Sequence, residues 1–183
     1  MKYKNLFIKY LTLCFLFIFF SLSSVAQEEQ NKDFPEAYFG KYAGELHVSS
    51  KKGLETYAME FHLLPTDSIG RYSYTLVYGE GEQLQKRLYT LIEKNAEKGE
   101  YVVNENNGIV IDDRVIDNRM YALFEVQGTL LTTFITFEKD HLIFEIIATN
   151  KEERKITGGQ NEVTPEVISY PITTVQRAIL FKQ

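Results

Sequence analysis

Successive short runs of alternating apolar and polar residues are the feature that most constrains how this chain folds. In one run Tyr57, Met59, Phe61 and Leu63 alternate with small or polar residues. The same rhythm recurs over residues 71–78, 87–93, 101–105, 109–111, 115–127, 129–137, 141–149 and 169–181. Because neighbouring side chains of a strand point to opposite faces, this period of two predicts a chain of consecutive β-strands.

Turn-forming residues separate the runs. They include Gly79-Glu80-Gly81, Glu97-Lys98-Gly99 and Asn106-Asn107-Gly108, and Asn-Gly is a strong signal for a tight hairpin. Hairpin-length links between short strands predict an antiparallel meander. Residues 88–98 are the best match to a helix, but a strand followed by a turn fits them equally well.

We count nine or ten strands, and a sheet of that length must close on itself or split into two packed sheets to avoid exposed edges. Residues 115–126 carry apolar side chains on both faces, which argues against one sheet with a wet face. We therefore predict an all-β domain over residues 34–183, an antiparallel meander closed into a barrel of about 8–10 strands. A sandwich is the alternative.

Residues 150–165 form the longest irregular stretch, charged at first and then rich in glycine and polar residues. Long links of this kind are usually functional or disordered. We predict that this segment acts as a lid for the barrel.

The first 26 residues have the pattern of a signal peptide. Three lysines precede an apolar run over residues 10–20, and Ser24, Val25 and Ala26 supply the small residues of a cleavage site. A lipoprotein anchored at Cys14 and an uncleaved membrane anchor are the alternatives. Cleavage after Ala26 leaves residues 27–33 as a disordered lead-in and places the protein in the periplasm or outside the cell.

Charge and cysteine content exclude several function classes. The chain has a net charge of −5, which becomes −8 once the three leader lysines are removed. An acidic surface argues against binding nucleic acid and against binding the surface of anionic membranes. Cys14 is the one cysteine, so the mature protein lacks disulfides, cysteine nucleophiles and thiolate metal sites. The sequence leaves the oligomeric state open.

The stretch FGKYAGEL, residues 39–46, resembles the Gly-x-Trp signature in the first strand of lipocalins and related calycin barrels. Gly40 and Tyr42 occupy the two signature positions, with tyrosine in place of tryptophan. The resemblance implies that Tyr42 closes the base of the barrel and that Arg177, in the last strand, packs over its ring as a cation on an aromatic face. These three residues are structural in that family.

Tyrosines dominate the central strands, and Tyr57, Tyr72, Tyr74 and Tyr121 are the residues we predict to line a ligand cavity. A tyrosine supplies apolar area together with one hydroxyl, which suits a small, mostly apolar ligand with one or two polar atoms. Ordinary packing between strands is the alternative explanation for all four.

Two carboxylates interrupt apolar strands, Glu125 in YALFEVQ and Glu145 in HLIFEIIAT. Inside the barrel they would bind a polar ligand group or do acid–base work, since buried charge is otherwise costly; facing solvent, they would do neither. The sequence shows no metal-binding motif, and we predict no metal and no cofactor. A haem held by a single histidine, with His62 as its ligand, is a remote alternative.

These observations favour an exported barrel that binds a small hydrophobic or amphipathic molecule non-covalently and catalyses no reaction. An envelope interaction module with a solidly packed barrel is the second hypothesis. An enzyme that uses buried carboxylates is the third.

Overall fold

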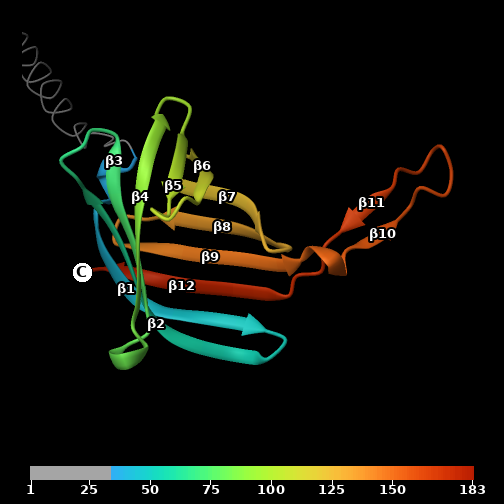
Figure 1. The fold of residues 1–183 in the computed structure, drawn as a ribbon, viewed down its shortest axis with the longest axis horizontal. Helices are drawn as coiled ribbons and strands as arrows, with labels where there is room; N and C mark the ends of the chain where they lie inside the picture. Colours follow the sequence, from blue (N-terminus) through green and yellow to red (C-terminus); the bar gives the residue numbers. More distant parts are fainter. Residues whose placement is uncertain (1–33) are drawn as a thin grey trace, which may run out of the picture. The chain divides into compact units, whose positions relative to one another are not determined.

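A computed structural model describes residues 34–183, so the predicted signal peptide and the lead-in over residues 27–33 lie outside the described part. Within residues 34–183, twelve strands and three short 3-10 helices follow one another (Figure 1). The elements are η2 (Glu36–Tyr38), β1 (Gly40–Ser50), β2 (Gly53–Pro65), β3 (Arg71–Tyr78), η3 (Gly81–Gln83), β4 (Gln85–Asn95), β5 (Glu100–Asn104), β6 (Val110–Ile116), β7 (Arg119–Val126), β8 (Thr129–Phe137), β9 (His141–Asn150), η4 (Lys151–Glu153), β10 (Lys155–Thr157), β11 (Val167–Ser169) and β12 (Thr174–Lys182).

Ten of these strands form a closed antiparallel barrel, which confirms the predicted fold class. Each strand from β1 to β8 pairs with the next in the chain, and β12 closes the circle between β9 and β1. We call the end where β1 finishes and β12 begins the mouth, and the opposite end the base. Within residues 34–183, no helix is long and apolar enough to cross a membrane.

The structure corrects two boundaries. Residues 115–127 are two strands, because Asp117 and Asn118 form a hairpin turn in which Asp117 has a φ of 54°. Residues 169–181 are likewise interrupted between β11 and β12, where Pro171 lies. Residues 88–98 are a strand followed by a turn, the second of the two predictions for them.

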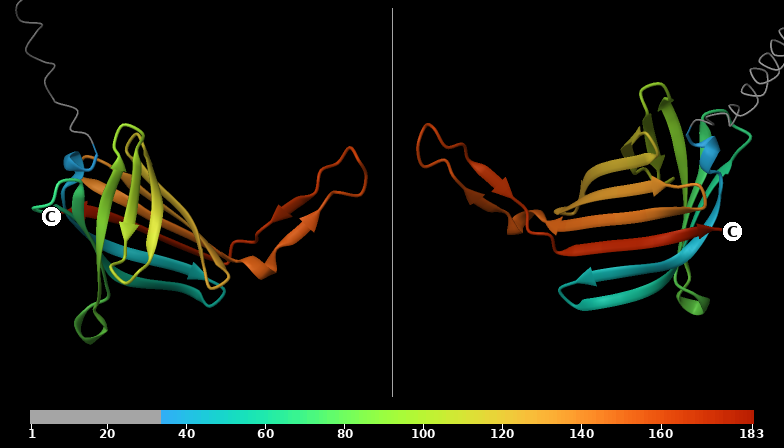
Figure 2. Two further views of the ribbon diagram at one scale, coloured as in Figure 1. Left: turned by 45° about the horizontal axis from the view of Figure 1, so that its top comes forward. Right: turned by 180° about the vertical axis from the view of Figure 1, so that it is seen from behind.

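The segment predicted as a lid, residues 150–165, is partly ordered. Residues 155–157 and 167–169 pair as the two-stranded hairpin β10–β11, and residues 158–166 form the irregular loop between them. The hairpin leaves the barrel from the mouth end of β9 and projects away from it (Figure 2). In this conformation it does not cover the mouth.

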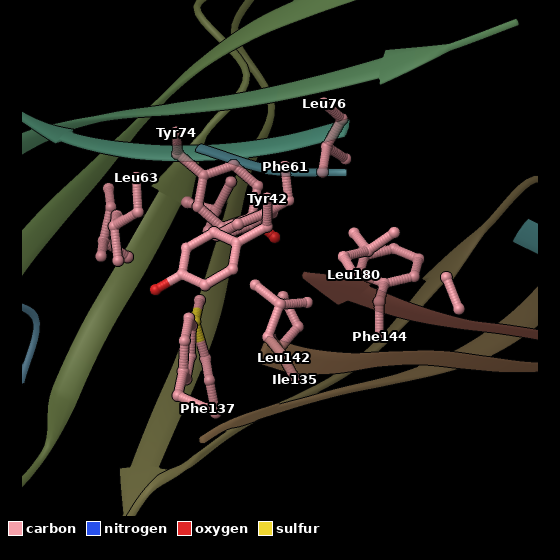
Figure 3. Close-up of a cluster of buried hydrophobic side chains, with 14 of the residues drawn as sticks. Tyr42, Phe61, Leu63, Tyr74, Leu76, Ile135, Phe137, Leu142, Phe144 and Leu180 are labelled. Carbon is pink, nitrogen blue, oxygen red and sulfur yellow. The ribbon is translucent and has the colours of Figure 1, made fainter. Parts of the chain in front are cut away.

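The base of the barrel is filled by a cluster of large apolar side chains. Tyr42 is 1% exposed and its ring lies between Phe61 and Phe137 (Figure 3). Ile135, Leu142 and Leu180 complete the packing around it, and all three are almost fully buried. This cluster makes the base a solid core.

Residues 34–39 form a plug over the base. The Phe34 ring lies 5.1 Å from that of Tyr101, and the Tyr38 ring lies 5.0 Å from that of Phe137. Tyrosine hydroxyls from three strands hold the plug: Tyr42 donates to the Tyr38 carbonyl (2.7 Å), Tyr101 to the Phe34 carbonyl (3.0 Å) and Tyr72 to the Glu36 carboxylate (3.0 Å). One end of the barrel is therefore sealed.

Closure brings β1 and β12 unusually close at Gly44. A methyl group on Gly44 would lie 2.4 Å from the backbone oxygen of Ile179. Backbone cannot move aside without opening the β1–β12 ladder, so this position requires glycine. Gly40 is less constrained, because a methyl group there would meet the flexible end of the Lys182 side chain at 2.6 Å.

We expect Gly44→Ala to lower the free energy of unfolding by about 1–3 kcal/mol, the usual cost of overpacking. Gly40→Ala is the matched control and should lose less, because the Lys182 side chain can shift. Urea unfolding of both variants measures the difference. Equal losses would contradict the close approach of β1 and β12 at Gly44.

Candidate functional site

The mouth half of the barrel is hollow. One chamber, of about 570 Å³, adjoins β1 and β2 and is lined by Leu46, Val48, Tyr57, Tyr78, Gly79, Gln83, Gln85, Arg87, Leu131, Ile146 and Gln176. A second chamber, of about 230 Å³, reaches toward β6 and β7 and includes Tyr74, Asp113, Ala122 and Phe144. The two share Tyr78, Arg87, Leu131 and Ile146, and we call them the β2 chamber and the β6 chamber.

Side-chain size explains why this half is hollow. At the base, the inward positions hold Phe, Tyr and Leu. Toward the mouth, Ala122 and Thr133 face each other across β7 and β8. Gln176 takes the corresponding inward position of β12. Smaller or polar side chains at these positions leave space along the barrel axis. The barrel does not narrow to fill this space, because backbone hydrogen bonding fixes the distance between neighbouring strands.

The strands also separate toward the mouth. The β2–β3 ladder ends at Met59, although β2 begins at Gly53. The β6–β7 ladder ends at the pair Asp113–Ala122, although β7 continues to Val126. Both gaps in the ladders lie beside the chambers, so the barrel wall opens laterally as well as axially.

Asp113 is the most unusual group in the β6 chamber. It is 9% exposed, and its Oδ2 atom has no hydrogen-bond partner among the described residues. The pKa of Asp113 is raised to about 8: burial is the main cause and nearby Asp112 adds to it, while a hydrogen bond from the Val103 backbone N–H to the carboxylate acts in the opposite direction. The side chain is therefore mostly a neutral acid at neutral pH.

The other polar groups of the β6 chamber come from β3, β4, β8 and Glu105, which directly follows β5. Arg87 lies 5.2 Å from the centre of the Tyr78 ring. Burial raises the pKa of Tyr89; nearby Arg87 acts to lower it and Glu105 acts to raise it. Burial also raises the pKa of Tyr78 to about 12 and that of Tyr74 well above its usual value. These tyrosines keep their protons at neutral pH.

Two of the four predicted tyrosines reach the chambers. Tyr57 lines the β2 chamber and Tyr74 lines the β6 chamber. Tyr72 lies at the base, where its hydroxyl donates to Glu36 and to Glu93 (3.3 Å). Tyr121 lies outside the barrel and packs edge-on against Phe134, 5.7 Å away. Tyr72 and Tyr121 therefore have structural surroundings, and Tyr78 and Tyr89 take their places in the cavity wall.

The two predicted carboxylates lie on the outer face. Glu145 pairs across the sheet with Phe134 and Arg177, whereas its neighbours Phe144 and Ile146 face the chambers. Arg119 and Arg177 flank its carboxylate at 3.4 and 3.5 Å. Glu125 forms an ion pair with Lys151, also outside. An inward position for these carboxylates is wrong, because alternation places their apolar neighbours inside.

The three predicted barrel-closing residues lie on β1 and β12. The Lys182 side chain lies against Gly40, and Tyr42, which pairs with Lys182 across the ladder, is buried at the base. The cation over the Tyr42 ring is Lys182, at 5.8 Å from the ring centre, and not Arg177. Arg177 and Lys182 are an odd number of residues apart on β12, so they lie on opposite faces of the strand. Arg177 is on the outward face and Lys182 on the inward face.

Sequence reasoning missed Asp113, although a signal for it exists. Ile111, Asp113 and Val115 alternate in VIDDRVI, so period two places the carboxylate on the apolar face. The adjacent Asp112 obscures this signal, because two successive acids look like a turn. The same reasoning applies to Glu105, which continues the inward series of Tyr101 and Val103.

Histidine and acidic side chains do not gather into a metal site. Within residues 34–183, no group of three or more His, Cys, Asp or Glu side chains is placed to hold a metal ion. His62 lies on the face of β2 opposite Phe61 and Leu63 and contacts Glu60 at 2.7 Å. It therefore does not face the interior, where an axial haem ligand would be needed.

Comparison with known proteins identifies no family for this chain. No family model matches the chain, and no curated protein matches it. Among solved structures, it is similar to a protein of unknown function of the DUF3598 family from Nostoc punctiforme, at 11% identity and a TM-score of 0.48. The match covers 81% of this chain and 48% of the other, so the chain spans about half that protein's length. The class that the structure itself defines is a ten-stranded antiparallel β-barrel, sealed at its base and hollow at its mouth.

The pKa of Asp113 predicts an unusual pH dependence of stability. Between about pH 4 and pH 8 the folded protein keeps a proton on Asp113 that the unfolded chain releases, so stability falls as the pH rises through this window, by at most about 1.4 kcal/mol per pH unit. Asp113→Asn should remove this slope and Asp112→Asn should keep it. Urea unfolding at several pH values tests this, and parallel curves for wild type and Asp113→Asn would refute it.

Proposed function

We propose that this protein is an exported, lipocalin-like carrier or sensor that binds a small hydrophobic or amphipathic molecule non-covalently in the two chambers and does no chemistry on it. The observation that carries the proposal is the void inside the mouth half of the barrel, because a barrel built only for stability is filled with side chains. Its volume lies in the range of small-molecule sites, about 300–1,000 Å³.

The walls of the chambers suit such a ligand. Leu76, Phe124, Leu131, Phe144 and Ile146 supply apolar surface to the β6 chamber. A few polar groups interrupt this surface at defined points, which is the usual composition of a pocket that binds and orients an amphipathic molecule. Because the base is sealed, the mouth and the gaps in the wall beside it are the routes in and out.

Exposed apolar side chains surround these routes. Leu54 is 71% exposed, Tyr57 41% and Val126 46%, near the mouth ends of their strands, and Ile109, directly before β6, is 46% exposed. Such residues on the rim would allow an apolar molecule to enter without passing a fully polar surface. Export to the periplasm or beyond, proposed from the signal sequence, would place the protein where apolar molecules need a carrier through water.

A cavity-filling substitution tests the proposal. Ala122→Phe should weaken binding of the fluorescent apolar dye Nile red at least about tenfold, because the new ring occupies the β6 chamber. Leu123→Phe is the matched control: it adds a ring one residue away on the outer face, where Leu123 is 67% exposed. It should bind the dye like wild type.

Native mass spectrometry of the protein purified from its own envelope without detergent complements this test. A bound small molecule that organic extraction removes would support the proposal. Absence of dye binding by wild type, or equal binding by both phenylalanine variants in folded form, would refute it.

An envelope interaction module is the second candidate, and the outer face of β12 favours it. Val175, Ile179 and Phe181 are 40%, 39% and 55% exposed on this face, around Arg177. Capture of one protein from envelope extracts by wild type, lost in Phe181→Ser, would support this function. The interaction-module hypothesis expects a solidly packed barrel, whereas the mouth half of this barrel is hollow.

A further inference from the structure

We propose that the polar end of the ligand is a neutral hydrogen-bond acceptor, such as the carbonyl oxygen of an ester or ketone, and that Asp113 binds it by donating a hydrogen bond as an uncharged acid. This inference rests on the proposed function, because it names the chemical class of molecule that the same cavity takes. It distinguishes that class from amines and carboxylates with the same apolar tail.

The position of Asp113 is the first argument. Its carboxyl group lies in the wall of the β6 chamber, at the last β6–β7 pair before the strands separate. One oxygen faces no donor or acceptor among the described residues. A buried polar atom without a partner costs about 1–3 kcal/mol, so a ligand atom that bonds to it recovers this cost on binding.

The surroundings of Asp113 decide which ligand atom fits. The groups around it are Tyr74 and Tyr78 on β3, Arg87 and Tyr89 on β4, Tyr101 on β5 and Glu105 directly after β5, whereas the neighbouring Asp112 lies on the outer face of β6. Among these, Arg87 is the one cation, and it shares Tyr89 with Glu105. Arg87 and Glu105 offset each other, so the chamber is electrically balanced only while Asp113 is uncharged.

The two charged alternatives fit less well. An ammonium group would require Asp113 to release its proton and would bury a new ion pair, whose desolvation cancels much of its attraction. A carboxylate would add a second negative charge beside Glu105. A neutral acceptor needs neither change, because the protonated acid already carries the hydrogen that it would donate.

The apolar part of the ligand also has a defined place. Ala122, Phe124 and Phe144 line the β6 chamber beside Asp113, and Leu131 and Ile146 continue the apolar wall into the β2 chamber. A ligand held by its polar end at Asp113 therefore extends its tail through the shared wall toward the larger chamber. This arrangement predicts recognition of an acceptor group at one end of an aliphatic chain.

Isothermal titration of the mature protein with methyl caprylate, octylamine and caprylate tests the inference, because the three share an aliphatic tail of similar length and differ in the polar end. Methyl caprylate should bind at least about tenfold more tightly than the other two. Tighter binding of octylamine or caprylate would overturn the inference while leaving the cavity function intact, since Nile red binding reports on that separately.

Variants at Asp113 add a second criterion. Asp113→Asn keeps an N–H donor of the same shape and should retain the affinity for methyl caprylate, whereas Asp113→Leu should lose about tenfold or more. Asp112→Asn is the matched control for removing an acid from β6 and should bind like wild type. Thermal unfolding verifies that each variant is folded, and wild-type affinity in folded Asp113→Leu would overturn the inference.

The pH dependence of binding shows whether Asp113 donates a hydrogen bond to the ligand or accepts one from it. The affinity of wild type for methyl caprylate should fall as the pH rises from about 7 to about 9, because Asp113 loses the proton it donates. The same titration of Asp113→Asn should be flat. An affinity that rises with pH in wild type would show that the ionised carboxylate binds the ligand, and would overturn the inference.

Discussion

The antiparallel pairing of β1 with β12 is the interaction on which the rest of this structure depends. It joins the first and last strands of the barrel and converts a meander with two exposed edges into a closed surface with an inside and an outside. The close approach at Gly44 is part of this closure, since there the two backbones leave no room for a side chain. Every assignment of a residue to the cavity or to the outer face follows from the register that this pairing completes.

Closure also explains why the two ends of the barrel differ. At the base, large inward side chains meet on the barrel axis and are covered by the plug, residues 34–39. The hydroxyl groups of Tyr42, Tyr72 and Tyr101 hold the plug in place by donating hydrogen bonds to it. At the mouth, the inward side chains are smaller and the ladders stop early, so the same barrel circumference leaves space. Stability is concentrated at one end, and the other end can tolerate a buried acid and an empty volume because the base holds the fold.

Much of the fold could be predicted from the sequence, and the errors have definite physical causes. Alternation and turn residues were sufficient for the all-β class, the meander and the closed barrel. Tyr42 was placed correctly at the base because a bulky aromatic between two glycines has few other uses in a first strand. The orientation of Glu145 was ambiguous because both faces of its strand are apolar. Phe144 and Ile146 lie on one face, and Ile143 and Ile147 share the other with Glu145, so the alternation does not show which face is inside. Arg177 follows the same register as Glu145 and lies outside with it.

What the sequence by itself determined is local: which residues form strands, where hairpins turn, and which side chains share a face, because these depend on spacing along one strand. What only the tertiary structure decided is which of the two faces lies inside, that Lys182 rather than Arg177 covers Tyr42, and that Asp113 reaches a hollow chamber. These depend on the register between strands far apart in the chain and on the summed volume of inward side chains from all ten barrel strands. No single stretch of sequence contains either quantity.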